Sequence, residues 1–170
     1  MHTYIALLRA VNVGGTGKLP MAELRTMCEA AGFAQVRTYI ASGNVVFTST
    51  FAAKQVKASL EAALAAYAGK PVGVLVRTPA EMAQVLAANP FPGAASNRTV
   101  AIFLDAPPPA DALATVKHRK DEEIVLGKRE IYVHYGDGMA DSKLVIPVAK
   151  TGTARNMNTV AKLVEMAGER

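Results

Sequence analysis

A glycine-rich loop between an apolar strand and a helix contains the residues of this chain that are best placed to do chemistry. The segment reads Leu7-Leu8-Arg9-Ala10-Val11-Asn12-Val13-Gly14-Gly15-Thr16-Gly17-Lys18-Leu19-Pro20-Met21. Backbone N–H groups of such a loop, a helix N-terminus and cationic side chains can surround one anion. We therefore predict an anion-binding site made by these loop residues: Arg9, Asn12, Gly14, Gly15 and Lys18. In the alternative interpretation, the glycines only form the turn and the cations are solvated.

The loop departs from the known nucleotide-binding motifs. A Walker A motif requires a glycine, four intervening residues and then Gly-Lys-Ser/Thr. Asn12 stands at the upstream glycine position here, and Leu19 replaces the hydroxyl residue that would bind Mg²⁺. Pro20 takes the place of the third small residue of the dinucleotide-binding pattern. The loop thus favours phosphate or carboxylate binding without the chemistry of those motifs.

A second polar segment lies near the C-terminus and reads Thr151-Gly152-Thr153-Ala154-Arg155-Asn156-Met157-Asn158-Thr159. We predict that Thr153 caps a helix near 155–167, with Arg155, Asn158 and Lys162 on one face. Amides and a guanidinium beside a helix N-terminus suit an anionic or nucleobase-like ligand. The candidate ligand-binding residues here are Arg155, Asn156 and Asn158. A solvated face is the alternative, and convergence with the loop residues into one site is a hypothesis.

A tight turn is predicted at Ser42-Gly43-Asn44, which separates two short β-rich runs at 35–41 and 45–49. Ser42 and Asn44 are further candidate ligand-binding residues. In a split β-α-β sheet, this turn and the loop after the first strand can lie at opposite ends. The two groups would then serve different surfaces, or the second half of the chain would bridge them.

Few residues suggest catalysis or metal binding. His2, His118 and His134 have no neighbouring His, Cys or carboxylate at metal-ligand spacing, so we predict no metal site. Cys28 lies on the apolar face of the first predicted helix, which indicates a buried structural thiol. Phe47 is the lone aromatic candidate for stacking on the central strands, which disfavours RNA recognition by that route. These residues leave open whether the protein is an enzyme, and they indicate no particular cofactor.

The composition is that of a folded protein with a moderate positive charge. The chain has 170 residues, 51% of them hydrophobic and 19% charged, with a formal net charge of +5. A buried core is therefore expected, and the charge permits but does not require a polyanionic partner. A single cysteine points to a reducing compartment. With no signal peptide and no apolar run of about 20 residues, we predict a cytoplasmic protein without a membrane partner. Its oligomeric state stays open.

Residues 1–77 predict the element order β-α-β-β-α-β, the ferredoxin-like split β-α-β arrangement. We expect strands at 3–9, 35–41, 45–49 and 72–77, and helices at 20–31 and 51–68. Pro20 suits the first helical position, and Gly32 suits the left-handed position after the helix. The core-facing residues of the second helix are expected to be Val56, Leu60, Leu64 and Tyr67.

Residues 78–170 predict a related half. Thr78, Pro79 and Glu81 have the pattern of a capped helix start. Further elements are expected as strands at 99–104, 123–126 and 130–134, and as helices near 110–116, 139–148 and 155–167. This α-β-α-β-β-α order predicts a second ferredoxin-related half that has lost or exchanged a strand and packs closely on the first.

Four segments form a recognisable combination: Leu8-Arg9-Ala10-Val11-Asn12-Val13-Gly14-Gly15, Pro20-Met21-Ala22-Glu23-Leu24-Arg25, Tyr39-Ile40-Ala41-Ser42-Gly43-Asn44-Val45-Val46-Phe47 and Ala154-Arg155-Asn156-Met157-Asn158-Thr159-Val160. Together they resemble the domain of unknown function 1697 family of bacterial proteins, over essentially the whole chain. The resemblance implies an α+β fold of two intertwined ferredoxin-like halves. Family members generally carry Arg-Asn-Trp-Asn-Thr near the C-terminus, where this chain has Met157, which argues against ring stacking there. The family has no established activity, so the resemblance assigns no catalytic residue.

The sequence thus predicts a protein that binds an anionic small molecule, such as a nucleotide or a phosphorylated metabolite. The alternatives are nucleic-acid binding through a basic surface and a protein-interaction module without catalysis. A basic surface predicts an affinity that falls steeply with salt and losses spread over many Lys and Arg changes. A small-molecule site predicts a dominant effect of Arg9→Ala or Arg155→Ala instead.

Overall fold

The computed structural model describes residues 1–9, 18–136, 139 and 142–168. The chain divides into two compact units: unit 1 is Met1–Met82 with Leu163–Arg170, and unit 2 is Ala83–Lys162. Both boundaries fall inside helices, α3 (Pro79–Ala87) and α4 (Met157–Gly168). No helix within the described ranges is long and apolar enough to cross a membrane.

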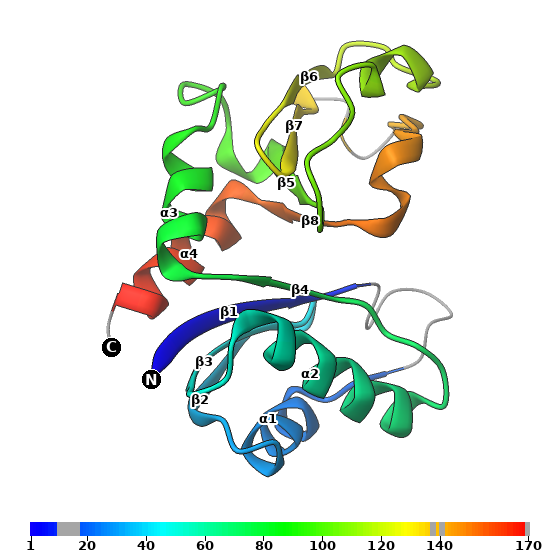
Figure 1. The fold of residues 1–170 in the computed structure, drawn as a ribbon. Helices are drawn as coiled ribbons and strands as arrows, with labels where there is room; N and C mark the ends of the chain where they lie inside the picture. Colours follow the sequence, from blue (N-terminus) through cyan, green and yellow to red (C-terminus); the bar gives the residue numbers. More distant parts are fainter. Residues whose placement is uncertain (10–17, 137–138, 140–141, 169–170) are drawn as a thin grey trace. The chain divides into compact units, whose positions relative to one another are not determined.

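Unit 1 contains a mixed α and β arrangement around one antiparallel sheet, which we call sheet A. Its strands are β1 (His2–Leu8), β2 (Ala34–Tyr39), β3 (Asn44–Ser49) and β4 (Val74–Arg77), in the order β2-β3-β1-β4. Every neighbouring pair in this order is antiparallel. The helices α1 (Met21–Ala30) and α2 (Ala53–Ala68) lie on the same face of the sheet (Figure 1). The elements predicted for residues 1–77 are therefore present, with ends that differ by a few residues.

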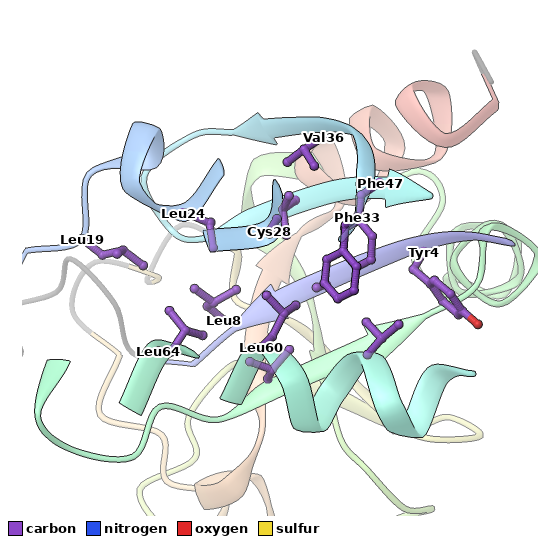
Figure 2. Close-up of a cluster of buried hydrophobic side chains, with 14 residues drawn as sticks. Tyr4, Leu8, Leu19, Leu24, Cys28, Phe33, Val36, Phe47, Leu60 and Leu64 are labelled. Carbon is purple, nitrogen blue, oxygen red and sulfur yellow. The ribbon is translucent and has the colours of Figure 1, made fainter. Parts of the chain in front are cut away.

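The core of unit 1 fills the space between sheet A and these two helices (Figure 2). Alternate strand residues reach it because successive side chains of a strand point to opposite faces. Its members are Tyr4, Ala6, Leu8, Leu19, Leu24, Cys28, Phe33, Val36, Val45, Phe47, Val56, Leu60, Leu64 and Val74. Tyr67 does not join them and is 48% exposed, so its predicted inward position is wrong. It lies in the last turn of α2, just before the helix ends at Gly69.

Two residues of this core, Phe47 and Cys28, have structural roles. The ring of Phe47 stacks on Phe33 with centroids 4.4 Å apart and is fully buried, so it cannot stack on a nucleobase. Cys28 is also fully buried, as predicted. Burial, with a smaller contribution from Glu29, raises the pKa of its thiol to about 12. A thiol with such a pKa is a poor nucleophile near neutral pH, so Cys28 is structural.

The ends of α1 follow the local sequence. Gly32 has a φ of +91°, and its N–H donates to the carbonyl of Glu29 while the N–H of Phe33 donates to that of Cys28. This pair of hydrogen bonds is the Schellman pattern expected where glycine ends a helix. Pro20 is the N-cap, with extended backbone angles, rather than the first helical residue.

Unit 2 is built on a second antiparallel sheet, sheet B. Its strands are β5 (Thr99–Phe103), β6 (Glu123–Leu126), β7 (Glu130–His134) and β8 (Thr153–Asn156), in the order β6-β7-β5-β8. In both sheets the second, third, first and fourth strands in sequence lie side by side in that order. All neighbouring strands of sheet B are antiparallel. The short 3₁₀ helix η1 (Ser96–Arg98) precedes β5, and η2 (Ala112–Thr115) and η4 (Pro147–Thr151) lie between later strands. η2 and η4 help cover a core made by Val100, Ile102, Leu104, Ile124, Ile131, Val133 and Ile146.

The prediction of a helix at 139–148 is wrong in the described part of that range. Val145 instead pairs with Lys117 in an isolated bridge, and Ile146 has extended backbone angles. Pro147 explains the difference, because proline disfavours helical angles in the preceding residue and lacks an N–H for a helix interior. Within 142–148, the chain is helical only from Pro147, as η4.

Sheet B has four strands, so no strand of the second half is lost. The fourth strand, β8, includes residues 155–156 of the helix predicted at 155–167. β8 pairs with β5, where Phe103 lies opposite Thr153 and Ala101 opposite Arg155. Its approach to β5 depends on Gly152, since a Cβ there would lie 2.5 Å from the carbonyl oxygen of Phe103. Tertiary pairing therefore decides the conformation of this polar segment.

Candidate functional site

The end of β1 and the hairpin turn lie at the same end of sheet A. Leu7 pairs with Asn44, and the N–H of Leu8 donates to the carbonyl of Gly43 at 2.9 Å. The expectation of opposite ends is wrong because β1 runs antiparallel to β3, so the last residues of β1 meet the first residues of β3. The next residue, Arg9, donates its N–H to the carbonyl of Gly73 at 2.9 Å. Three segments distant in sequence thus meet around Arg9.

Both cations of the predicted loop lie within the described residues. Arg9 is partly exposed, and Lys18 is exposed. Leu19, the residue after Lys18, is buried in the same cluster as Leu8 (Figure 2), which anchors this part of the chain near the end of β1. The remaining predicted loop residues, Asn12, Gly14 and Gly15, lie outside the described residues.

Asn44 and Ser42 hold the hairpin turn together. Asn44 is fully buried, and its Nδ2 donates to the carbonyl of Tyr39 at 2.8 Å and to Oγ of Ser42 at 2.9 Å. The turn also has two residues with positive φ, Ile40 at +50° and Gly43 at +89°. A fully buried amide that closes a turn has a structural role. Ser42 is partly exposed beside it and is the residue of the pair that a ligand can reach.

Arg155 has a different environment from the one predicted. It lies in the edge strand β8, not on a helix face, and is 6% exposed. Its Nη1 donates to Oγ1 of Thr153 at 2.7 Å and to the carbonyl of Ala154 at 2.9 Å. Burial lowers the pKa of the guanidinium from its ordinary 12.5 to about 10. These contacts make Arg155 part of the internal structure of unit 2.

The two asparagines next to Arg155 also have partners in the fold. Oδ1 of Asn156 accepts a hydrogen bond from the N–H of Thr159 at 2.9 Å, so Asn156, and not Thr153, caps α4. Oδ1 of Asn158 accepts one from Oγ of Ser96 at 2.7 Å on the exposed surface. The structure therefore brings the three residues together as a strand-to-helix junction.

A similar junction, which the sequence reasoning missed, lies at Arg77 in unit 1. Arg77 is opposite Ile5 at the end of edge strand β4, is 1% exposed, and donates from Nη1 to the carbonyl of Val76 at 3.2 Å. The next residue, Thr78, caps α3 in a capping box: its N–H donates to Glu81 Oε1 and its Oγ1 accepts from the N–H of Glu81. An arginine, a capping residue and a helix thus follow each other at the ends of both β4 and β8. The repeated pair, Arg77-Thr78 and Arg155-Asn156, is the sequence signal that could have indicated it.

A serine and a carboxylate also meet in unit 2. Oγ of Ser142 donates to Oε2 of Glu122 at 2.5 Å, and the N–H of Lys120 donates to the same carboxylate at 2.6 Å. These bonds, that of Ser142 first, lower the pKa of Glu122 from its ordinary 4.5. A carboxylate stabilised in its ionised form is a weak base for a serine hydroxyl. We therefore interpret the contact as a structural tie. Across the described residues, no three His, Cys, Asp or Glu side chains gather in a way that could hold a metal ion.

Known proteins share both the sequence pattern and the fold. A family model described as "Protein of unknown function (DUF1697)" matches residues 1–132. The structure of the conserved bacterial protein SP0830 from Streptococcus pneumoniae is similar, with a TM-score of 0.80, 26% sequence identity and coverage of 99% of both chains. A comparison with curated proteins found no match. The matched range includes the Arg9 loop and the hairpin turn and ends before β8, while the structural similarity extends over both units. The chain belongs to the DUF1697 family.

Proposed function

We propose that this protein binds an anionic small molecule, such as a nucleotide or a phosphorylated metabolite, at the end of sheet A where β1 ends. The observation that carries the proposal is the meeting of three segments at Leu8 and Arg9, whose N–H groups bond to Gly43 and Gly73. These hydrogen bonds hold the backbone of Arg9 on the sheet. Arg9 as a residue is partly exposed, and a guanidinium on a backbone held in this way can donate two parallel hydrogen bonds to a phosphate or carboxylate.

Neighbouring residues support the same ligand class. Lys18 adds a second exposed cation close in the chain to the buried Leu19. Ser42 offers a hydroxyl on the turn that contacts the end of β1. Asn12, Gly14 and Gly15 enter the proposal as sequence predictions only.

The ferredoxin-like topology of both halves is part of this proposal. Its support is the strand order, β2-β3-β1-β4 in sheet A and β6-β7-β5-β8 in sheet B, with antiparallel neighbours throughout. Two split β-α-β units generate this order, and they place the loop after the first strand beside the hairpin turn. The proposed site is therefore a feature of the topology as well as of Arg9.

The residues of the second polar segment have a structural role in this proposal. Arg155 and Asn156 both bond to their own strand and helix. Arg9 belongs to unit 1 and Arg155 to unit 2. Convergence of the two groups into one site stays a prediction. The proposal concerns binding, and it assigns no reaction.

Thermal unfolding in the presence of candidate ligands tests the proposal. Inorganic phosphate, nucleotides, sugar phosphates and short oligonucleotides are compared on the wild type, Arg9→Ala and Arg25→Ala. A ligand at 100 times its Kd stabilises the folded state by about 2.7 kcal/mol, which gives a clear rise in Tm. We expect a phosphate-containing small molecule to raise the Tm of the wild type and of Arg25→Ala but not of Arg9→Ala. Arg25→Ala is a matched control because it removes the same charge from α1. The Arg25 side chain is 61% exposed and forms an ion pair with Glu29.

The other outcomes identify the alternatives. Equal losses for Arg9→Ala and Arg25→Ala, together with a steep salt dependence and a preference for oligonucleotides, would indicate nucleic-acid binding through general surface charge. A Tm that no anion changes in the wild type would contradict the proposal and favour a protein-interaction module.

A further inference from the structure

Gly73 lies directly beside the side chain of Arg9. Leu8 pairs with Val74 across β1 and β4, and the carbonyl of Gly73 accepts the backbone N–H of Arg9 at 2.9 Å. A Cβ built on Gly73 would lie 3.1 Å from Cδ of Arg9, 3.6 Å from its Cβ and 3.7 Å from its Cγ. The three heavy atoms nearest to that position all belong to the Arg9 side chain. The Arg9 side chain therefore packs directly against the position that a Cβ at 73 would take.

The backbone does not require a glycine at this position. The φ of Gly73 lies outside the left-handed region, so other residues can adopt its conformation. Gly152, at the start of β8, differs in this respect because a Cβ there would meet the carbonyl oxygen of Phe103 at 2.5 Å. What distinguishes glycine at 73 is the space that it leaves for one cationic side chain.

We propose that Gly73 is a positioning residue for the anion-binding guanidinium of Arg9, an inference that rests on the proposed function. By leaving its surface bare, Gly73 lets the aliphatic part of Arg9 lie across the start of β4. The hydrogen bond from the Arg9 N–H fixes the backbone end of this side chain, and contact with Gly73 restrains Cγ and Cδ. A guanidinium restrained in this way loses less conformational freedom when it binds an anion.

Phosphate titration of Gly73→Ala tests this role, with Gly93→Ala as the matched control. Gly93 also has no left-handed φ, and a Cβ there would meet nothing within 4 Å. A methyl group at 73 would lie 3.1 Å from Cδ of Arg9, so this side chain must shift by a few tenths of an ångström. The expected cost of this shift is about two- to tenfold in affinity for inorganic phosphate. We expect this loss in Gly73→Ala and no change in Gly93→Ala. Both variants should keep the stability of the wild type or exceed it slightly, because alanine restricts the unfolded chain.

The Arg9→Ala background separates positioning from a structural effect. Without the Arg9 side chain, Gly73→Ala has nothing to displace, so the double variant should bind phosphate as Arg9→Ala does. Unchanged phosphate affinity in Gly73→Ala, or residual phosphate binding of Arg9→Ala that Gly73→Ala lowers further, would overturn the inference.

An NMR measurement distinguishes failure of the inference from failure of the proposed function. If the wild type does not bind phosphate, the proposed function fails, and the order of the Arg9 Nε–H group then decides the positioning role alone. We expect this group to be more ordered than that of the exposed Arg25, and to lose order in Gly73→Ala but not in Gly93→Ala. Equal mobility of Arg9 and Arg25 in the wild type would refute the positioning role.

Discussion

Arg9 follows the last residue of β1 and is partly exposed, whereas Arg155 lies inside the edge strand β8 and is 6% exposed. Both arginines stand in polar segments that the sequence marks as candidate ligand sites. The guanidinium of Arg155 bonds to Thr153 and Ala154 within its own strand, and burial lowers its pKa to about 10. Arg9 instead is held through its backbone and through the contact of its aliphatic part with Gly73.

The difference shows that the residue type alone does not determine the role of an arginine. A buried guanidinium is removed from water at a cost, and its hydrogen bonds to nearby oxygens recover part of that cost. A partly exposed guanidinium avoids most of this cost and keeps access to ligands in the solvent. Arg77 is the structural counterpart of Arg155, since each precedes a helix-capping residue at the end of an edge strand. Arg77 and Arg155 therefore have the environment of structural residues, whereas the binding role of Arg9 is a proposal.

The largest effect is expected for Arg155→Ala, which should lower the free energy of unfolding by about 3 kcal/mol. The change removes a buried side chain and its hydrogen bonds to Thr153 and Ala154. Arg155→Met keeps much of the volume and removes a charge that is costly to bury, so it should lose less. Urea unfolding measures both, and Arg9→Ala should stay within about 0.5 kcal/mol of the wild type. A loss in Arg9→Ala as large as that in Arg155→Ala would contradict the contrast between the two arginines.

An intermediate loss in the free energy of unfolding is expected for Asn44→Ala, which tests whether Asn44 has a structural role beside Arg9. The change removes two hydrogen bonds of a fully buried amide, to Tyr39 and to Ser42, and should cost about 2 kcal/mol in urea unfolding. Ser42→Ala keeps the bond to Tyr39 and should cost less, about 0.5–1 kcal/mol. Loss of phosphate binding in Asn44→Ala without loss of stability would instead make Asn44 a ligand-binding residue.

Effects smaller than that of Asn44→Ala are expected at the two helix caps, which test whether the Arg77 and Arg155 junctions are equivalent. Thr78→Ala and Asn156→Ala each remove a capping oxygen and should each cost about 1 kcal/mol. Thr78→Ser and Asn156→Asp retain that oxygen and serve as controls, with unfolding followed by circular dichroism. A cost at only one of the two positions would show that the junctions differ.

The elements of residues 1–77 were predicted well because their signals are local. Gly32 ends α1 in the left-handed conformation, and Gly69, with a φ of +72°, ends α2. The capping box at Thr78 and Glu81 forms as expected. Such signals act within one helical turn, so they can be read without knowledge of the tertiary structure.

The second polar segment was predicted wrongly for a non-local reason. Thr153–Asn156 has little β propensity, and it forms β8 because β5 offers it a ladder of hydrogen bonds. The helix consequently starts at Met157, which moves Arg155 from a helix face to a buried strand. The same reasoning missed Arg77, whose burial also depends on the position of its edge strand.

By itself, the sequence determined α1 and α2 with the glycines that end them, the capping box of α3, the hairpin turn, the buried Cys28, and the two polar segments to search for function. Only the tertiary structure decided which arginine is buried, that the hairpin turn meets the end of β1, and that Gly73 lies beside Arg9. The physical reason is the range of the interactions. Caps and turns are made by residues a few positions apart, whereas burial and strand register are set by partners tens of residues away.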